Sequence, residues 1–312
     1  MRVAFFASAA AFTSAQLTTI PASDPLVSWV GRRAVLPSGA VGFDYEGVSA
    51  SMNITGLGVL LANITDSCAG GPVGGGSRWL VTYTPNDART APANHRIQTF
   101  FTSPFASVYT LFSVPGKRCD PPCSLDGVLT LTRLTESRLS GCGPSGGLSV
   151  ASFSTDGVFV APPPPSTRRL EILGDSITAG DLNDGDGASV CANAMFNDDI
   201  TLSSAGRLCL PLAQGGFGAD CMFTAWGGIR LGDAQQGWGM EALYPFTFSA
   251  LGENAYGAWN FSSWVPHGVI INLGTKWVPM RLPLPLPPHP PFIYIDHRNT
   301  RPARALNPTS LQ

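Results

Sequence analysis

Ser176 is the residue of this sequence best placed to act as a nucleophile. It follows a short strand-like run, 170–173, and lies in the turn Gly174-Asp175-Ser176 that leads into Ile177-Thr178-Ala179-Gly180. A serine at a strand-to-helix turn exposes its hydroxyl at the carboxyl end of a sheet, where ligands of open α/β sheets bind. This arrangement predicts attack on an acyl group. The alternative interpretation is a serine that caps the N-terminus of a helix.

The residues around this turn alternate between expected strands and helices. Strands are predicted over 170–173, 220–226 and 269–273, and the apolar spacing predicts a helix over 203–213. Pro211 would kink or end that helix. Strand, crossover helix and strand in succession predict an α/β domain with a doubly wound, flavodoxin-like parallel sheet.

Residues 28–155 have the pattern of an all-β domain. Short runs rich in β-forming residues predict strands over 41–45, 48–54, 57–61, 79–83, 97–101, 108–112 and 128–132. Their regular spacing favours a sandwich or jelly roll. Four consecutive prolines, 162–165, predict a stiff linker over 161–167. We place the domain boundary at this linker.

Two motifs resemble those of a known family. The pattern GDSIT-x-G around Ser176 resembles the first motif of the GDSL/SGNH esterases and lipases. Val30-Gly31-Arg32 and the stretch Phe-Asp-Tyr-Glu-Gly-Val-Ser at 43–49 resemble the N-terminal β-sandwich of carbohydrate esterase family 2. The resemblance covers roughly 28–115 and 168–275. A GDSL lipase is the weaker interpretation, because it leaves the N-terminal sandwich unexplained.

The resemblance implies a β-sandwich at 28–155 followed by an SGNH hydrolase domain at 168–277, which we expect to be incomplete. It also implies a serine esterase that removes O-acetyl groups from polysaccharide without a metal or organic cofactor. Ser176 would be the nucleophile and its N–H one oxyanion donor, with Gly174 and Asp175 shaping the turn.

The second and third motif blocks are also present. Residues 224–231 resemble the family's S-G-x-G-L block, although Gly227 replaces its serine and Arg230 its later glycine. Gly228 is the expected second oxyanion donor, because a residue without a side chain lets the backbone approach substrate. The alternative is a plain β–α turn. The third block, 269–275, ends in Gly274 and Thr275, which support the motif.

The match fails after Thr275. Lys276 stands where the family has its oxyanion-hole asparagine, and Trp277 replaces an aspartate. A lysine is a longer and looser donor than an amide, and loss of one oxyanion donor typically costs about 10²–10³ in rate. One hypothesis is that the reading frame leaves the family sequence at Lys276.

No D-x-x-H block follows, so the sequence does not identify the catalytic base. His289 and His297 lie in or just beyond a proline-rich tail, 278–312, which is expected to be disordered. His267 is predicted to be structural, and His95 to lie at a surface or loop of the sandwich.

Composition narrows the remaining function classes. The net charge is −2 and charged residues are 13% of the chain, so no basic field exists for nucleic acid. Residues 1–15 have the pattern of a signal peptide, and no stretch reaches the ~18 apolar residues of a membrane span. Seven cysteines and sequons at Asn53, Asn63 and Asn260 fit a secreted protein. Cys119 and Cys123 are predicted to form a structural disulfide rather than a metal or redox site.

Two functions remain open. The first is a secreted polysaccharide deacetylase. The second is a catalytically impaired relative that binds carbohydrate or acts at a surface. Trp226, Trp238 and Trp259 could stack on sugar rings, but we expect them to pack in the core or between domains.

Overall fold

The computed structural model describes residues 16–66, 76–86, 95–113, 125–136, 148–184, 197–210, 216, 218–231, 239–248, 257–274 and 293–295. The expected signal peptide, the Cys119–Cys123 pair, Thr275, Lys276, His289 and His297 lie outside these residues. So does the proline run at 283–288.

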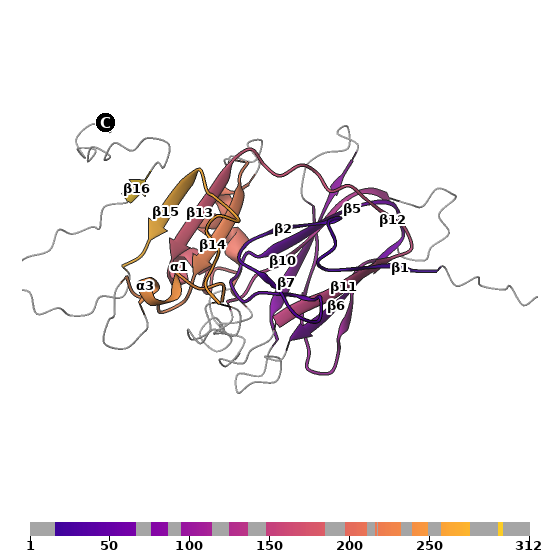
Figure 1. Ribbon diagram of the computed structural model, residues 1–312, viewed down its shortest axis with the longest axis horizontal. Helices are drawn as coiled ribbons and strands as arrows, with labels where there is room; N and C mark the ends of the chain where they lie inside the picture. Colours follow the sequence, from indigo (N-terminus) through magenta and orange to yellow (C-terminus); the bar gives the residue numbers. More distant parts are fainter. Residues whose placement is uncertain are drawn as a thin grey trace, which may run out of the picture.

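Two six-stranded antiparallel sheets form the N-terminal part of the chain (Figure 1). The first contains β3 (Ala34–Val35), β4 (Val41–Gly42), β11 (Leu148–Thr155), β6 (Val59–Asp66) and β9 (Val108–Ser113), with β1 (Thr18–Pro21) paired to β11. The second contains β12 (Val158–Val160), β5 (Ser49–Leu57), β10 (Leu125–Arg133), β7 (Arg78–Pro85) and β8 (His95–Phe101), with β2 (Val27–Val30) paired to β5.

Alternating side chains build the core of this β part. Burial alternates residue by residue along β5, β6 and β10, as expected for strands with one face in a core. The buried cluster includes Phe43, Met52, Leu60, Trp79 and Phe153. This cluster contains more buried side chains than either of the other two clusters, so it is the main hydrophobic core among the described residues.

A third sheet carries the Ser176 turn. Its order is β14 (Asp220–Ala225), β13 (Arg169–Gly174), β15 (Gly268–Asn272) and β16 (Ile293–Ile295). The first three strands pair in parallel, whereas β16 is antiparallel to β15. The helices are short: α1 (Ser176–Ala179), the 3₁₀ turn η4 (Ile200–Leu202), α2 (Ser204–Leu208) and α3 (Met240–Leu243).

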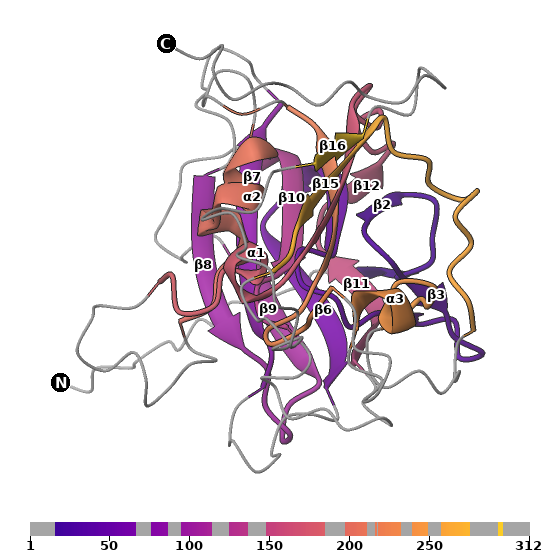
Figure 2. The same ribbon diagram turned by 90° about the vertical axis from the view of Figure 1, so that its left-hand side faces the viewer.

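Apolar clusters cover this third sheet on both faces. Ile172, Cys221 and Phe223 join one cluster, which also includes Leu80 of β7. Leu173 and Val269 belong to the other, together with side chains of α3. Figures 1 and 2 show the third sheet beside the β part, and the first cluster lies where the two meet.

The family motif at 43–49 lies at that meeting place. Gly47 has φ +71°, and a Cβ there would lie 2.3 Å from Phe223 of β14. Val48 packs against Gly31 in the same way, since a Cβ on Gly31 would lie 2.7 Å from the Val48 side chain. The glycines of both N-terminal motifs therefore allow close contacts within and between the two parts of the chain.

Several element predictions need correction. The expected helix over 203–213 is wrong in length: α2 begins after Ser203, whose hydroxyl accepts from the Gly206 N–H at 3.0 Å, and ends at Leu208. The chain turns back there, because Gly218 N–H donates to Leu210 O and Cys209 is bonded to Cys221.

Two predicted strands are also wrong in extent. The strand expected over 57–61 is interrupted at Gly58, where Asp156 Oδ1 accepts from the Gly58 and Val59 N–H groups and the chain passes from one sheet to the other. The strand expected over 41–45 ends at Gly42, because the following residues leave the sheet and bond to Arg133. The tail, expected to be disordered, contributes the Ile-Tyr-Ile run of β16.

The linker predicted over 161–167 contains no helix or strand. The jelly-roll connection, the flavodoxin-like winding and the domain bounds stay predictions. Sheet residues extend beyond 28–155 at both ends, in β1 and β12.

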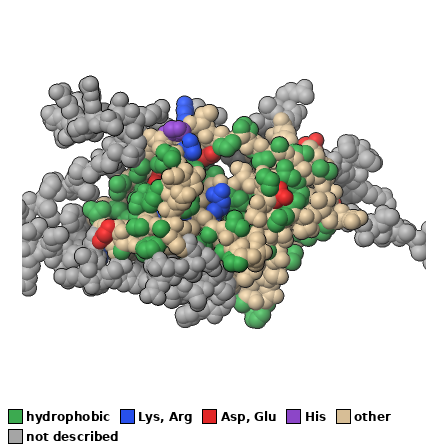
Figure 3. All heavy atoms as spheres, viewed as in Figure 1, with side chains coloured by type: hydrophobic (Ala, Val, Ile, Leu, Met, Phe, Trp, Pro, Cys, Tyr) green, Lys and Arg blue, Asp and Glu red, His purple; other side chains and the backbone are tan. Residues whose placement is uncertain are grey.

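Charged side chains are sparse on the face of the molecule that Figure 3 shows. No helix among the described residues is long and apolar enough to cross a membrane.

Candidate active site

The carboxyl ends of three strands meet at one edge of the third sheet. In the register, Gly174 at the end of β13 lies beside Ala225 at the end of β14 and beside Asn272 at the end of β15. Because the three strands are parallel, the residues that follow all leave the sheet at this edge. The three motif blocks recognised in the sequence are therefore neighbours, as ligand sites in open α/β sheets require.

Ser176 opens the first helix turn after β13. Asp175, not Ser176, is the N-cap: its buried carboxylate accepts from the Ile177 N–H at 3.2 Å. The interpretation of Ser176 as a helix cap is therefore wrong. Ser176 is half-buried, and no hydrogen bond to its hydroxyl is found within the described ranges. The hydroxyl is thus available for chemistry rather than used for capping.

The residues around Ser176 fix its position through close packing. A Cβ on Gly174 would lie 1.9 Å from Thr178 Oγ1, so this position accepts only glycine. Thr178 is fully buried, and its hydroxyl accepts from Asn272 Nδ2 at 3.1 Å. Gly180, with φ +81°, ends the turn by donating its N–H to Ser176 O. The structure therefore explains why the GDSIT-x-G pattern has glycine at 174, threonine at 178 and glycine at 180.

Gly228 lies in a turn that follows β14 at the same edge. Its φ of +85° is the left-handed conformation that favours glycine. Trp226 N–H donates to Gly174 O at 3.2 Å, which brings this turn beside the Ser176 turn. Neither the Gly228 N–H nor the Ser176 N–H has a hydrogen bond in the described part of the chain. Both are available as oxyanion donors.

Glu136 holds the same turn from the β part of the chain. Its buried carboxylate accepts from the Gly227 N–H, and a Cβ on Gly227 would lie 2.7 Å from its Oε1. Gly227 therefore replaces the family's serine at a place where a side chain would collide with Glu136. No local sequence pattern indicates this contact, because Glu136 is 91 residues away.

The third block is described only as far as Gly274, which has φ +123°. Asn272 is a positioning residue to which the sequence assigned no role, and its amide joins the third block to Thr178 of the first. Thr275 and Lys276 lie outside the described residues, so their predicted roles stay predictions.

His267 is at the wrong end of the sheet to act as the base. Its Nδ1 accepts from the Arg169 N–H at 3.0 Å, and its N–H donates to Arg169 O. Arg169 begins β13 whereas Gly174 ends it, and five steps of about 3.3 Å separate them by roughly 16 Å. The prediction that His267 is structural is confirmed. His95 contributes its backbone to β8.

A buried carboxyl group lies close behind the Ser176 turn. Asp198 Oδ1 accepts from the N–H of Leu182, which has φ +61°. Burial, with further contributions from Asp181 and Glu136, raises the pKa of Asp198 to about 8 despite the Leu182 hydrogen bond. Burial therefore favours the protonated form of the Asp198 carboxyl. Asp181, Asp198 and Glu136 are not placed to bind a metal ion together: within the described ranges, no group of three or more His, Cys, Asp or Glu side chains could hold one.

Arg32 fastens the β part of the chain to the strand that carries Ser176. It is fully buried, and its Nη2 donates to Glu171 Oε1 of β13 at 3.0 Å. Its Nη1 donates to the carbonyl oxygens of Tyr244 and Phe246. The rings of Tyr45, Tyr244, Trp259 and Phe261 surround the guanidinium at 4.6–5.7 Å. The glutamate inside the apolar run 170–173 indicated a buried charge, but not which cation pairs with it.

The described tryptophans near the site pack internally. Trp226 is buried in the cluster on the α3 face of the sheet, and Trp259 is buried beside Arg32. The prediction of core or interdomain packing is confirmed for both. Trp238 lies outside the described residues.

Comparison with known proteins gives one curated relative and a set of solved structures. The cellulase/esterase CelE of Acetivibrio thermocellus is 32% identical over 124 residues, which are 38% of this chain and 14% of CelE. A family 2 carbohydrate esterase from Clostridium thermocellum, in complex with cellohexaose, is 23% identical with a TM-score of 0.60, covering 80% of this chain and 66% of that one. An acetyl xylan esterase from the rumen bacterium Butyrivibrio proteoclasticus is 21% identical with a TM-score of 0.58, covering 83% and 64%.

These comparisons confirm the resemblance at the level of the fold. The described chain has the fold of family 2 carbohydrate esterases and spans about two thirds of the length of these two solved structures. No protein-family model matches the chain.

Proposed function

We propose that this chain is a carbohydrate esterase of the SGNH type that removes O-acetyl groups from polysaccharide through Ser176. The observation that carries the proposal is the parallel register at Gly174, Ala225 and Asn272, which gathers the three motif blocks at one edge. The free N–H groups of Ser176 and Gly228 add support, because an oxyanion hole needs preorganised donors. The acetyl and polysaccharide assignments rest on the family resemblance, since relatives include an acetyl xylan esterase and a cellohexaose complex.

The proposed reaction has two steps. Ser176 Oγ attacks the acetyl carbonyl carbon, a base takes its proton, and the sugar hydroxyl leaves with a proton while the acetyl group stays on the serine. Water then attacks the acyl-serine, which releases acetate and restores the Ser176 hydroxyl. This route needs neither a metal nor an organic cofactor.

The base is the open part of this proposal. His267 lies roughly 16 Å from the Ser176 end of β13, by the rise of about 3.3 Å per residue, so it cannot accept the serine proton. His289 and His297 are the remaining candidates beyond the third block. Lys276 would face the oxyanion in place of the family's asparagine.

A second candidate function follows from the position of His267. If no other histidine reaches Ser176, the chain is an impaired esterase relative that binds carbohydrate without turnover. The Lys276 replacement also favours this candidate. Internal packing of Trp226 and Trp259 removes two of the aromatic side chains that could have stacked on sugars.

Hydrolysis of p-nitrophenyl acetate by the purified chain tests the first candidate. We expect turnover that Ser176→Ala abolishes and that the matched control His267→Ala retains. His289→Ala and His297→Ala then identify the base as the variant that loses both turnover and fluorophosphonate labelling of Ser176 while its circular dichroism still shows a folded protein. Equal rates for the parent chain and Ser176→Ala would exclude Ser176 as the nucleophile. Retention on polysaccharide affinity gels without turnover would establish the second candidate.

We also propose that the protein is secreted. The expected signal peptide at 1–15, the sequons and the disulfide between Cys209 and Cys221 support this location. Mass spectrometry of the protein recovered from culture medium tests it, and a mature N-terminus near Gln16 is the expected result.

A further inference from the structure

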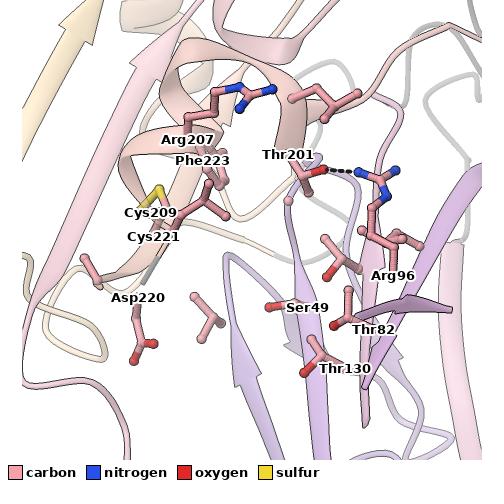
Figure 4. Close-up of a pocket in the computed structure, with 17 residues that line it drawn as sticks. Ser49, Thr82, Arg96, Thr130, Thr201, Arg207, Cys209, Asp220, Cys221 and Phe223 are labelled. Atoms are coloured by element: carbon pink, nitrogen blue, oxygen red, sulfur yellow. Dashed lines mark hydrogen bonds between the residues drawn. A yellow bond between two sulfur atoms is a disulfide. The ribbon is translucent and has the colours of Figure 1, made fainter. Parts of the chain in front are cut away.

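A cavity of about 370 Å³ lies between the β part of the chain and the third sheet, away from Ser176. One wall is the outer face of β5, β10, β7 and β8, and the other is formed by α2 and the start of β14 (Figure 4). Its volume is within the range of about 300–1,000 Å³ that small-molecule sites occupy.

The cavity and the Ser176 turn are at opposite ends of the same strand. Asp220, which begins β14, lines the cavity, whereas Ala225, which ends β14, lies beside Gly174. Five steps of about 3.3 Å separate them by roughly 16 Å. A ligand in the cavity is therefore not the acetyl group at Ser176.

Hydroxyl groups are arranged in rows across the sheet wall. The register places Ser51, Thr130, Thr82 and Arg96 side by side across four strands, and Ser49 beside Thr132 in the next row. Thr130 already shares a hydrogen bond with Ser51 at 2.8 Å. The hydroxyls of Ser49, Thr82 and Thr132 line the cavity, are half-buried, and have no hydrogen-bond partner in the part of the chain that the structure describes.

The charges of the lining are unequal. Arg96 is neutralised by Asp199, at 2.6 Å, and also donates to Thr201. Arg207 on α2 has no ion pair or hydrogen bond among the described residues. Figure 4 shows Arg207 and Asp220 on the α2 and β14 side of the cavity, with Cys209 and Cys221 between them, and Ser49, Thr82 and Thr130 on the opposite side. One side therefore offers the exposed Arg207 guanidinium and the Asp220 carboxylate, which also accepts from the Ser166 N–H at 2.9 Å, and the other side offers hydroxyls.

We propose that this cavity binds a sugar unit that carries one carboxylate, a uronic acid. Its carboxylate would pair with Arg207, whose planar fork suits bidentate carboxylate recognition. Its ring hydroxyls would bond to Ser49, Thr82 and Thr132, which are otherwise unpaired, and to Asp220 as an acceptor. A neutral sugar would leave Arg207 unused, and a simple anion would leave the hydroxyl rows unused, so both should bind more weakly.

Calorimetric titration of the full chain with D-glucuronate tests the proposal, with D-glucose and acetate as comparison ligands. We expect one site for glucuronate. Glucose should bind at least about tenfold more weakly because it lacks the charge-assisted hydrogen bond to Arg207, and acetate at least about tenfold more weakly because it lacks the hydrogen bonds of the ring hydroxyls. Arg207→Ala should weaken glucuronate binding by about tenfold or more, and Arg207→Lys by less. Thr132→Val should weaken it by about twofold to tenfold, whereas Thr110→Val, on β9 and outside the cavity, should not change it.

Three results would overturn the proposal: no heat with glucuronate, equal binding of acetate and glucuronate, or unchanged affinity in Arg207→Ala. Circular dichroism of each variant checks that it is folded. Hydrolysis of p-nitrophenyl acetate should be unchanged in Arg207→Ala, and glucuronate affinity should be unchanged in Ser176→Ala. The binding proposal and the esterase proposal can therefore fail separately.

Discussion

Replacing Arg32 by methionine should destabilise the protein severely, because it leaves the Glu171 carboxylate buried without its cation. The two side chains are 0% and 2% exposed, and Nη2 lies 3.0 Å from Oε1. Removing one partner of a buried ion pair costs about 3–5 kcal/mol. The lost bonds to the carbonyls of Tyr244 and Phe246 add to this cost. Tyr244 Oη still donates to Glu171 Oε2 at 3.1 Å, so we expect a value near the lower end.

A double-mutant cycle in urea isolates the pair from these other contacts. Arg32→Met and Glu171→Met should each cost about 3 kcal/mol, whereas the double variant should cost much less than their sum, since apolar replacement of a whole buried pair is often near neutral. The measurement is the unfolding midpoint and slope by circular dichroism. Costs that simply add would refute the inference that Arg32 and Glu171 stabilise one another. A loss near 3 kcal/mol would be a large share of the ~5–15 kcal/mol that domains possess.

Three further changes test the local geometry. Gly174→Ala should cost at least about 1–3 kcal/mol by overpacking against Thr178, seen as a lower thermal midpoint, and a wild-type midpoint would contradict the 1.9 Å contact. Asp198→Asn should flatten the pH dependence of stability. The pKa of Asp198 is about 8 in the folded protein and about 3.9 in the unfolded chain, so the wild-type protein becomes less stable as the pH rises from about 4 to 8. If the free energy of unfolding, measured by chemical denaturation at several pH values, fell equally with pH in the wild type and the variant, this prediction would be wrong. Replacing Cys209 and Cys221 by serine should cost about 3 kcal/mol, as expected for a loop of this length; denaturation with and without reductant measures it, and the double variant should not respond to reductant.

The sequence predicted those parts of the fold that depend on local patterns. The apolar runs at 170–173, 220–226 and 269–273 became β13, β14 and β15 within a residue or two at each end. These runs are long and apolar enough for burial on both faces to determine their conformation. The GDSIT-x-G motif likewise indicated the strand-to-helix turn in which Ser176 begins α1.

The parts that failed depend on contacts between distant residues. The periodicity at 203–213 indicated a longer helix, but the disulfide from Cys209 to Cys221 and the turn to β14 end it at Leu208. Nothing in the local sequence shows that Glu136 bonds to Gly227 or that Arg32 reaches Glu171, since these pairs are 91 and 139 residues apart. A helix cap at Ser176 was a reasonable alternative, because serine and aspartate are both good caps; only the geometry shows that Asp175 has that role.

The register of β13 also has a consequence for how the protein is made. Leu170 pairs with Cys221 on one side and with Gly268 on the other, about 50 and about 100 residues later in the chain. Parallel pairing over such distances requires loop closure before any contact forms, which makes it slow. During synthesis Ser176 leaves the ribosome well before either neighbouring strand. Until β14 and β15 have been made, β13 has two unpaired edges beside the Ser176 turn, which exposes it to misassociation.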